Sequence, residues 1–421
     1  MRFTPHIFLI ALATLLLGCT TVPAAPLPLA RTLHTPASAQ TPMREPVTIL
    51  VSIDGFRPDY LTRGVTPNLN ALAASGISGA MRPSFPSVTF PNHWTLVTGL
   101  RPDRHGIVGN RMEDTRRGGE VFTMQSEDSF WWDAAEPLWI TAENAGVRSA
   151  TMFWPGSSVA LGGKRPSDWQ QFGHEVNNRQ RVDAIVDWLR RPAATRPRFL
   201  TLYFDTVDSA GHKYGPDDAR TTAAVADIDT AIAQLRAGLA ELGQPANLVI
   251  VADHGMAATG PDRVILLNTI ASPASYRVVT AGSYAGIEPQ AGHEAELASA
   301  LARPNDHMRC WPKAQIPPAL HYGHNARVPS FICLAQPGWL ILEKAPPADR
   351  PITAGGAHGY DGASPEMAAL FIANGPAIAA HGPLPAFDNV DVAPLVRHLL
   401  GLPPGTGLDG NDAPFRPALR Q

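Results

Sequence analysis

Three runs of β-branched and aliphatic residues constrain the fold of this chain more than any other feature. They span residues 47–53, 199–204 and 248–251, and near-continuous apolar runs of this length are typical of strands buried on both faces of a sheet. Helical patterns lie between them, at residues 181–189 and 223–242. Strands that alternate with helices predict an α/β domain with a mostly parallel central sheet flanked by helices.

Length and composition exclude several classes of protein. The chain has 421 residues, of which 44% are hydrophobic and 17% charged, and disordered chains are poorer in apolar residues. After residue 20 no apolar run approaches the roughly 20 residues that a membrane-spanning helix needs. The formal net charge is -3, and no basic stripe favours a surface that binds nucleic acid.

The N-terminal residues predict export. Arg2 precedes an apolar run at residues 7–17, which has the length of a signal-peptide core and is short for a membrane span. The run ends at Cys19 in a sequence that resembles the lipobox of bacterial lipoproteins, so residues 1–19 are interpreted as a signal peptide. An ordinary signal peptide cleaved near residues 37–39 is the alternative.

Lipidation of Cys19 would anchor the chain in a membrane, and Thr20 after it favours the outer membrane under the usual bacterial sorting pattern. Residues 20–45 are rich in Pro and Ala and predict a tether. The membrane is therefore expected as a partner only through this N-terminal lipid anchor, and the folded part is expected in the periplasm.

The chain after the tether is predicted to form one α/β domain at residues 46–415. The stretch at about 265–350 is less regular and is interpreted as an inserted lobe. It contains Cys310 and Cys333, which can form a disulfide in an oxidising compartment. Two separately buried thiols remain the alternative, because the sequence does not give the distance between them.

Acidic and histidine side chains follow each predicted strand. The first strand leads to Asp54, the second to Asp208 and His212, and the third to Asp253 and His254. Because ligands of open α/β sheets bind outside the carboxyl ends of the strands, these side chains are expected to converge on one rim. A fourth segment carries His358 between glycines, which allow close approach of the backbone.

No single piece of this pattern is specific, because an isolated Asp at a strand end is more often a cap or turn residue. The convergence of several segments is what predicts a metal centre. Mixed carboxylate and imidazole ligands suit zinc. Two zinc ions about 4 Å apart can clamp the attacking and leaving oxygens of a displacement at phosphorus.

A candidate nucleophile lies between the first two acidic segments. Pro91 suits the first turn of a helix, which places Thr89 just outside the helix N-terminus. There the helix dipole and free N–H groups favour an alkoxide and an incoming phosphate. The alternative is that Thr89 or Ser87 only caps the helix.

Several short motifs together resemble the nucleotide pyrophosphatase/phosphodiesterase family of the alkaline phosphatase superfamily. They occur in the family's order and spacing, and the resemblance covers most of residues 46–412. The matching pieces are IDGFR at 53–57, TFPNH at 89–93, GIVGN at 106–110, Asp208 with His212, DHG at 253–255, HGY at 358–360 and VDVAPL at 390–395.

The resemblance implies a role for each matching residue. Thr89 is implied to be the nucleophile, which forms a covalent phosphothreonine-type intermediate, and Asn110 to donate to a phosphoryl oxygen. The implied ligands are Asp54, Thr89, Asp253 and His254 for one zinc, and Asp208, His212 and His358 for the other.

Three aromatic residues match positions near the family's substrate. Phe90 and Tyr203 match the pair that sandwiches a nucleobase, and Trp154 lies in a block near the pocket. Core packing is the alternative for each of them. The histidines His93, His105, His321 and His324 lie near candidate motifs, and they are interpreted as structural or surface residues.

Charge favours a diester as substrate. The charge of +4 on two zinc ions balances the charge of −4 on three aspartates and a threonine alkoxide, so a singly anionic diester needs no further cation, whereas a dianionic monoester does. The expected enzyme is a phosphodiesterase or pyrophosphatase that acts on nucleotides. The alternatives are a phosphomonoesterase or phosphonate hydrolase of the same superfamily and, from another class, a non-catalytic zinc-binding lipoprotein.

Overall fold

The computed structural model describes residues 44–379 and 382–420. The predicted signal peptide, the lipobox cysteine Cys19 and nearly all of the predicted tether therefore lie outside the described residues. Within the described part, no helix combines the length and the apolar character that crossing a membrane requires.

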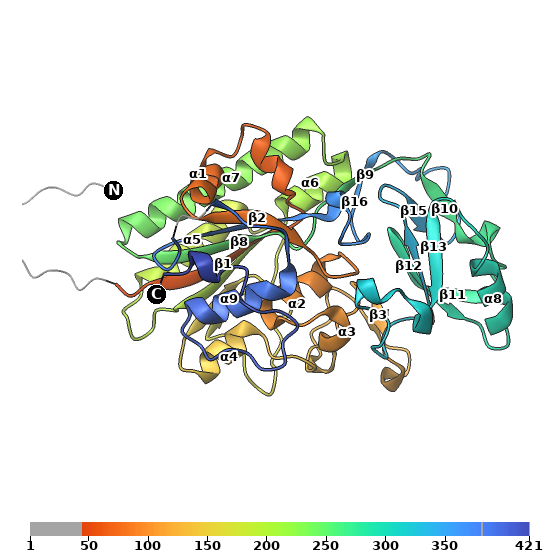
Figure 1. The fold of residues 1–421 in the computed structure, drawn as a ribbon, viewed down its shortest axis with the longest axis horizontal. Helices are drawn as coiled ribbons and strands as arrows, with labels where there is room; N and C mark the ends of the chain where they lie inside the picture. The colour runs from red at the N-terminus through yellow and green to blue at the C-terminus, as the bar shows by residue number, and fades with distance from the viewer. Residues whose placement is uncertain (1–43, 380–381, 421) are drawn as a thin grey trace, which may run out of the picture. The chain divides into compact units, whose positions relative to one another are not determined.

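The three predicted strands form the centre of one large sheet (Figure 1). β1 (Val47–Ile53) lies between β7 (Phe199–Phe204) and β8 (Ala246–Val251), and both pairings are parallel. Every residue of β1 and β7 is buried, as expected for apolar strands covered on both faces. The prediction of a mostly parallel central sheet is confirmed.

Shorter strands extend this sheet on both sides. Beyond β7 lie β5 and β6, both parallel; beyond β8 lies β17, which is antiparallel to its neighbours β8 and β2. The antiparallel strand was not predicted, and its neighbour β2 carries two short parallel edge strands, β18 and β19. The bounds are β2 Ile77–Arg82, β5 Ser149–Met152, β6 Asp168–Trp169, β17 Ala369–Asn374, β18 Gly382–Pro383 and β19 Phe387–Asp388.

Helices cover the two faces of the large sheet (Figure 1). On one face α7 packs against α1, α5 and α6, and on the other α2 and α4 pack against α9. The predicted helical patterns fall in α5 and α7, and α5 begins with a capping box formed by Asn177 and Gln180. The bounds are α1 Pro67–Ala74, α2 Thr89–Thr98, α3 Pro102–His105, α4 Leu138–Asn144, α5 Asn178–Arg190, α6 Thr206–Tyr214, α7 Ala219–Glu241 and α9 Val392–Leu399.

A second, four-stranded antiparallel sheet lies within the stretch predicted as an inserted lobe (Figure 1). Cys310 and Cys333 are directly paired on its adjacent strands β13 and β14, and they form a disulfide with a Cα–Cα distance of 4.0 Å. Together with α8 this sheet encloses a hydrophobic core separate from that of the large sheet. The bounds are β11 Tyr276–Thr280, β12 Tyr284–Pro289, β13 Met308–Pro312, β14 Phe331–Ala335 and α8 Glu294–Leu301.

Three small strand pairs and several 3-10 turns complete the described secondary structure. The strands β9 and β16 pair antiparallel. Along the chain, β9 follows β8 of the large sheet, and β16 precedes β17 of the same sheet. The bounds are β3 Met112–Glu113, β4 Val121–Phe122, β9 Ala257–Thr259, β10 Val264–Leu266, β15 Leu340–Leu342, β16 Gly355–Ala357, η1 Pro58–Thr62, η2 Thr115–Arg117, η3 Ser129–Trp131, η4 Leu267–Thr269, η5 Lys313–Gln315, η6 Pro318–Leu320, η7 Pro365–Met367, η8 Asn389–Asp391 and η9 Arg416–Ala418.

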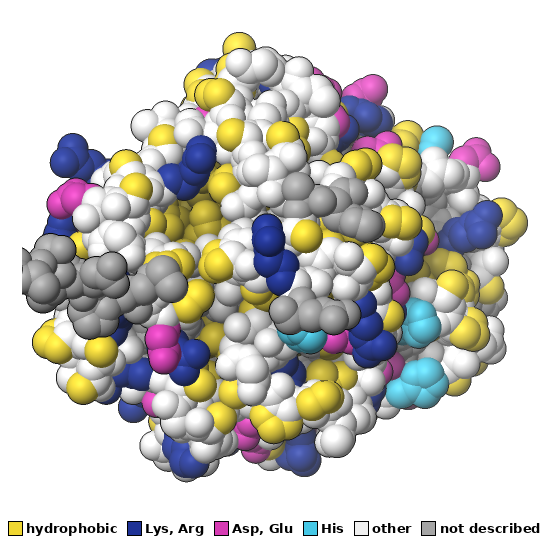
Figure 2. All heavy atoms as spheres, turned by 60° about the vertical axis from the view of Figure 1, so that its left-hand side comes forward, with side chains coloured by type: hydrophobic (Ala, Val, Ile, Leu, Met, Phe, Trp, Pro, Cys, Tyr) yellow, Lys and Arg dark blue, Asp and Glu magenta, His cyan; other side chains and the backbone are white. Residues whose placement is uncertain are grey.

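Charged side chains are dispersed on the face that Figure 2 shows. Lys and Arg side chains stand singly or in small groups there, among acidic and apolar ones. This face carries no basic stripe of the kind that tracks a nucleic-acid backbone.

Candidate functional site

Acidic and histidine side chains meet where the central strands end. Asp54 follows β1, and Asp253 and His254 follow β8, while Asp208 and His212 lie on α6, which follows β7. Their ligand atoms form three overlapping groups, each within 4.8 Å: Asp208, His212 and His358; Asp54, Asp208 and His254; Asp54, His93 and Asp253. The expected convergence on one rim is therefore present in the structure.

One half of this cluster surrounds His254. Its Nε2 lies 3.0 Å from Asp253 Oδ2 and 3.4 Å from Asp54 Oδ1. Thr89 Oγ1 lies 3.4 Å from the same nitrogen. Two carboxylates, an imidazole and a hydroxyl thus face one small volume.

The other half joins two imidazoles and a carboxylate. The Nε2 atoms of His212 and His358 are 3.0 Å apart, and Asp208 Oδ1 lies 3.5 Å from the first and 3.6 Å from the second. The rings of His254 and His358 stack with centroids 3.5 Å apart. The two halves are therefore direct neighbours.

The donor atoms fit divalent metal ions. Asp54 Oδ1, Asp208 Oδ1 and Asp253 Oδ2 are buried and have no hydrogen-bond partner among the described residues, and such oxygens are costly to bury unless a cation satisfies them. Burial and the neighbouring Asp253 and Asp208 carboxylates raise the pKa of Asp54 well above its usual value. A bound cation would reverse that effect, since it favours the charged form.

Backbone carbonyls orient the three imidazoles. The Nδ1 atoms of His212, His254 and His358 lie 2.9–3.0 Å from the carbonyl oxygens of Gly356, Gly255 and Ser87. A ring that donates from Nδ1 presents Nε2 as the ligand atom. Burial, with the nearby His254 and His212, lowers the pKa of His358 well below its usual value, which keeps that ring in the neutral form that binds metal.

Two glycines let β16 approach α6 closely enough to bring His358 to His212. A Cβ at Gly355 would lie 2.4 Å from the carbonyl oxygen of His212, and one at Gly356 would lie 2.6 Å from that of Gly211. Real Cβ atoms do not approach backbone oxygens so closely, so these positions require glycine.

Thr89 is the first residue of α2, where the sequence placed it just outside the helix. The extended residue Val88 occupies the N-cap position, so Pro91 is the third helical residue and lies in the first turn, as expected. Proline is tolerated throughout the first turn because those N–H groups have no partner within the helix. The hydroxyl still lies at the positive end of the helix dipole, as expected.

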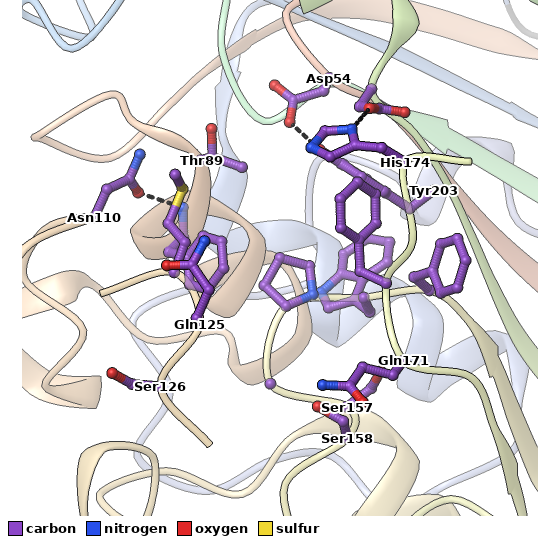
Figure 3. A pocket seen from close by; sticks show the side chains of 18 of the residues that line it. Asp54, Thr89, Asn110, Gln125, Ser126, Ser157, Ser158, Gln171, His174 and Tyr203 are labelled. Atoms are coloured by element: carbon purple, nitrogen blue, oxygen red, sulfur yellow. Dashed lines mark hydrogen bonds and ion pairs between the residues drawn. The ribbon is translucent and has the colours of Figure 1, made fainter. Parts of the chain in front are cut away.

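The side chain of Asn110 accepts a hydrogen bond from a free backbone N–H in the first turn of α2. Its Oδ1 accepts a hydrogen bond from the backbone N–H of Phe90 at 2.9 Å, which leaves the amide group Nδ2 as a donor. Both Asn110 and Thr89 line a cavity of about 430 Å³ (Figure 3). The cavity has the size of a site for a small organic molecule.

The three aromatic residues noted in the sequence are both packed and part of the cavity wall. Phe90 is half-buried, whereas Tyr203 and Trp154 are 8% and 3% exposed, and all three line the cavity. Two of them also make polar contacts with the site. Tyr203 donates its hydroxyl to Asp54 Oδ2 at 2.6 Å, and Trp154 donates Nε1–H to the carbonyl of His93.

His93 lies closer to the cluster of acidic and histidine residues than the sequence indicated. It is buried, and its Nδ1 lies 3.3 Å from Asp253 Oδ2 and 2.9 Å from the carbonyl oxygen of Thr89, while Nε2 lies 2.8 Å from Ser52 Oγ. The spacing of four residues after Thr89 places both on one helix face, and this signal could have identified it. His105, His321 and His324 lie outside the cluster and the cavity lining.

Two loops of the cavity wall were not predicted at all. Residues 124–127 and 170–174 supply lining side chains, and they carry no motif that separates them from other polar loops. The first lies between β4 and η3, and the second between β6 and α5.

Comparisons with known proteins agree with this geometry. The family model for type I phosphodiesterase/nucleotide pyrophosphatase matches residues 48–361. The chain is 37% identical to bis(5′-adenosyl)-triphosphatase enpp4 of Xenopus laevis, over 85% of this chain and 78% of that protein. The chain belongs to the nucleotide pyrophosphatase/phosphodiesterase family.

Further relatives of this family match in sequence and in structure. An uncharacterized pyrophosphatase/phosphodiesterase of Schizosaccharomyces pombe is 35% identical over 87% of this chain and 80% of that protein. Murine ectonucleotide pyrophosphatase/phosphodiesterase 5, an inactive threonine-to-alanine variant solved in complex with AMP, superposes with a TM-score of 0.84 at 32% identity. The superposition covers 89% of this chain and all of that one. The chain is thus a nucleotide pyrophosphatase/phosphodiesterase with the fold of the alkaline phosphatase superfamily.

Proposed function

We propose that this enzyme hydrolyses phosphodiester or phosphoanhydride bonds of nucleotides with two zinc ions and a covalent intermediate on Thr89. The main support is the position of Thr89 Oγ1, which lies 3.4 Å from His254 Nε2 and at the wall of the cavity. The relatives are consistent with nucleotide substrates, because one is named for a bis-adenosyl triphosphate and another was solved with AMP.

The residues that would hold the zinc ions follow from the two halves of the cluster. Asp54, Thr89, Asp253 and His254 would hold one, and Asp208, His212 and His358 the other. Zinc accepts such mixed oxygen and nitrogen donors. When bound, the two ions supply positive charge that stabilises the oxygens of a displacement at phosphorus.

The chain's own groups account for the remaining chemistry. Thr89 Oγ gives up its proton to the leaving oxygen or to solvent and attacks phosphorus while the bond to the leaving oxygen breaks, which leaves the nucleotide on Thr89 as a phosphothreonine-type ester. Asn110 donates Nδ2–H to a non-bridging oxygen, since its Oδ1 already accepts from Phe90 N–H. Hydrolysis of the Thr89 Oγ–P bond then restores the hydroxyl. Phe90 and Tyr203 provide flat apolar surfaces for a nucleobase.

We expect a diester to react faster than a monoester. None of the described residues that line the cavity is Lys or Arg, and Asn110 is a neutral donor. The second charge of a monoester would therefore meet no cationic side chain. Comparable kcat/KM values for bis- and mono-p-nitrophenyl phosphate would favour the phosphomonoesterase or phosphonate hydrolase alternative.

The variant Thr89→Ala tests the proposed intermediate. It should lower kcat for bis-p-nitrophenyl phosphate by at least about 1000-fold, because no nucleophile remains, while zinc measured by elemental analysis stays bound. Thr89→Ser keeps a hydroxyl and is the matched control that should retain measurable turnover. Activity retained in the alanine variant would remove Thr89 from the mechanism, and a wild type with zinc but no turnover would favour a non-catalytic zinc-binding protein.

We further propose that the chain is exported to the periplasm with a lipid on Cys19. The apolar run at 7–17 and the lipobox-like sequence that follows support this. Cys19→Ser should release the protein from membranes in cell fractionation, and a variant that stays membrane-bound would contradict the anchor.

A further inference from the structure

The end of the cavity away from Thr89 is lined by polar side chains. In Figure 3, Ser126, Ser157, Ser158 and Gln171 lie on the side opposite Thr89, Asp54 and Asn110. A substrate whose phosphorus lies at Thr89 and whose flat group extends between Phe90 and Tyr203 would point its far edge toward these groups. The hydrogen-bonding groups on this far edge are what distinguish one flat group from another.

Glu127 is fixed at this polar end by two loops. Its Oε1 accepts hydrogen bonds from Ser158 Oγ and from Gln171 Nε2, both at 2.9 Å. Ser158 lies after β5 and Gln171 after β6, so two separate strands position one carboxylate. The side chain of Glu127 lines the cavity.

The second carboxylate oxygen of Glu127 is available to a ligand. Glu127 is exposed; its Oε1 accepts the two hydrogen bonds above, and its Oε2 has no hydrogen-bond partner among the described residues. An ionised carboxylate only accepts hydrogen bonds. It therefore favours a ligand edge that donates, and it disfavours one that presents carbonyl oxygens.

We propose that Glu127 selects nucleobases that carry an exocyclic amine (adenine, cytosine and guanine) over uracil and thymine, which carry none. This inference depends on the proposed function. Adenine and cytosine present an amine donor where uracil and thymine present a carbonyl oxygen. Uracil has one N–H between two carbonyl groups, so a carboxylate that reaches this N–H also meets a carbonyl oxygen. Stacking on Phe90 and Tyr203 serves every base and does not discriminate between them.

The p-nitrophenyl esters of 5′-AMP and 5′-UMP test this selection, because they share one leaving group. The wild type should show a kcat/KM about tenfold higher for the AMP ester, in the range that one good contact to a base edge provides. Glu127→Gln keeps the size of the side chain and adds a donor, so the AMP/UMP ratio should fall to about one. Both esters are measured on one preparation. If part of the variant is unfolded, both kcat/KM values fall by the same factor, so the AMP/UMP ratio still reports on the folded enzyme.

Glu120→Gln is the matched control, because Glu120 is an exposed glutamate of the same segment that does not line the cavity. It should retain the wild-type ratio. A wild-type ratio near one, a wild type that prefers UMP, or a tenfold ratio retained in Glu127→Gln would overturn the role of Glu127. Failure of the wild type to hydrolyse bis-p-nitrophenyl phosphate would instead overturn the proposed function.

Discussion

Tyr203 connects the cavity wall to Asp54, a carboxylate of the candidate metal site. Its ring lines the cavity, and its hydroxyl donates to Asp54 Oδ2 at 2.6 Å. Because Asp54 Oδ1 has no partner among the described residues, this hydrogen bond fixes the carboxylate with one oxygen directed at the cluster. The same side chain therefore contacts the space for substrate and the group that would hold an ion.

Tyr203→Phe removes this hydrogen bond and keeps the ring. A hydrogen bond to a charged group contributes about 1.5–3 kcal/mol, so kcat should fall about tenfold or more while KM for a nucleotide ester changes little. Steady-state kinetics and zinc content measure the effect. Tyr276→Phe is the matched control, because the buried Tyr276 hydroxyl has no partner among the described residues. If Tyr203→Phe had the kcat of the wild type, Tyr203 would not position Asp54.

At the scale of elements, the close approach of α6 and β16 positions the second half of the cluster. His212 lies on α6, and His358 follows β16 directly. The two elements are far apart in sequence, and they meet because β16 pairs with β9, which follows β8 closely along the chain. Because residues 355 and 356 are glycines, the backbone of β16 can approach the backbone of α6 closely enough to bring the two imidazoles together.

Gly356→Ala should separate these elements. The added Cβ would lie 2.6 Å from the carbonyl oxygen of Gly211, so β16 must move and His358 with it. We expect zinc content to fall by about one ion per chain and activity to fall at least about tenfold, since misplaced ligands weaken metal binding. Elemental analysis and bis-p-nitrophenyl phosphate hydrolysis measure both effects.

Gly79→Ala on β2 provides the comparison for this variant. A Cβ at Gly79 makes only ordinary contacts with Leu384 and Phe387, so zinc content and activity should match the wild type. Full zinc content in Gly356→Ala would show that β16 can shift without cost to the site.

At the scale of the whole molecule, the cluster of acidic and histidine residues is a concentration of buried charge at the rim of the large sheet. Asp54 and Asp253 are almost fully buried, and the unpartnered oxygens of the cluster come from segments after three adjacent strands. Without a cation, burial and the neighbouring carboxylates raise the pKa of Asp54, and burial raises the pKa of Asp208, so the charged forms of these two groups disfavour the folded state.

Removal of metal should therefore lower the melting temperature. A chelator should lower Tm by several degrees, and titration with zinc should raise it again in proportion to the logarithm of free zinc, as linkage requires for a ligand of the native state. Scanning calorimetry at fixed pH measures the change. A Tm independent of zinc would contradict the assignment of these residues as a metal site.

Regular patterns made much of the fold predictable. The runs at 47–53, 199–204 and 248–251 form the three central strands, because burial on both faces demands continuous apolar sequence. The antiparallel strand β17 and the four-stranded sheet were not predicted. Their direction follows from long-range pairing that leaves no mark on local sequence.

The sequence by itself determined the chemistry of this protein: which carboxylates, imidazoles and hydroxyl are available, and that strand ends would bring most of them to one rim. It could do so because strand direction and ligand type are properties of short segments. Only the tertiary structure decided which oxygens have no partner, that Tyr203 holds Asp54, that His93 reaches Asp253, and that Glu127 lies at the far end of the cavity. Tyr203 and Asp54 are 149 positions apart, and Glu127 is 31 and 44 positions from its partners Ser158 and Gln171; the distances of such contacts are set by packing of the whole domain.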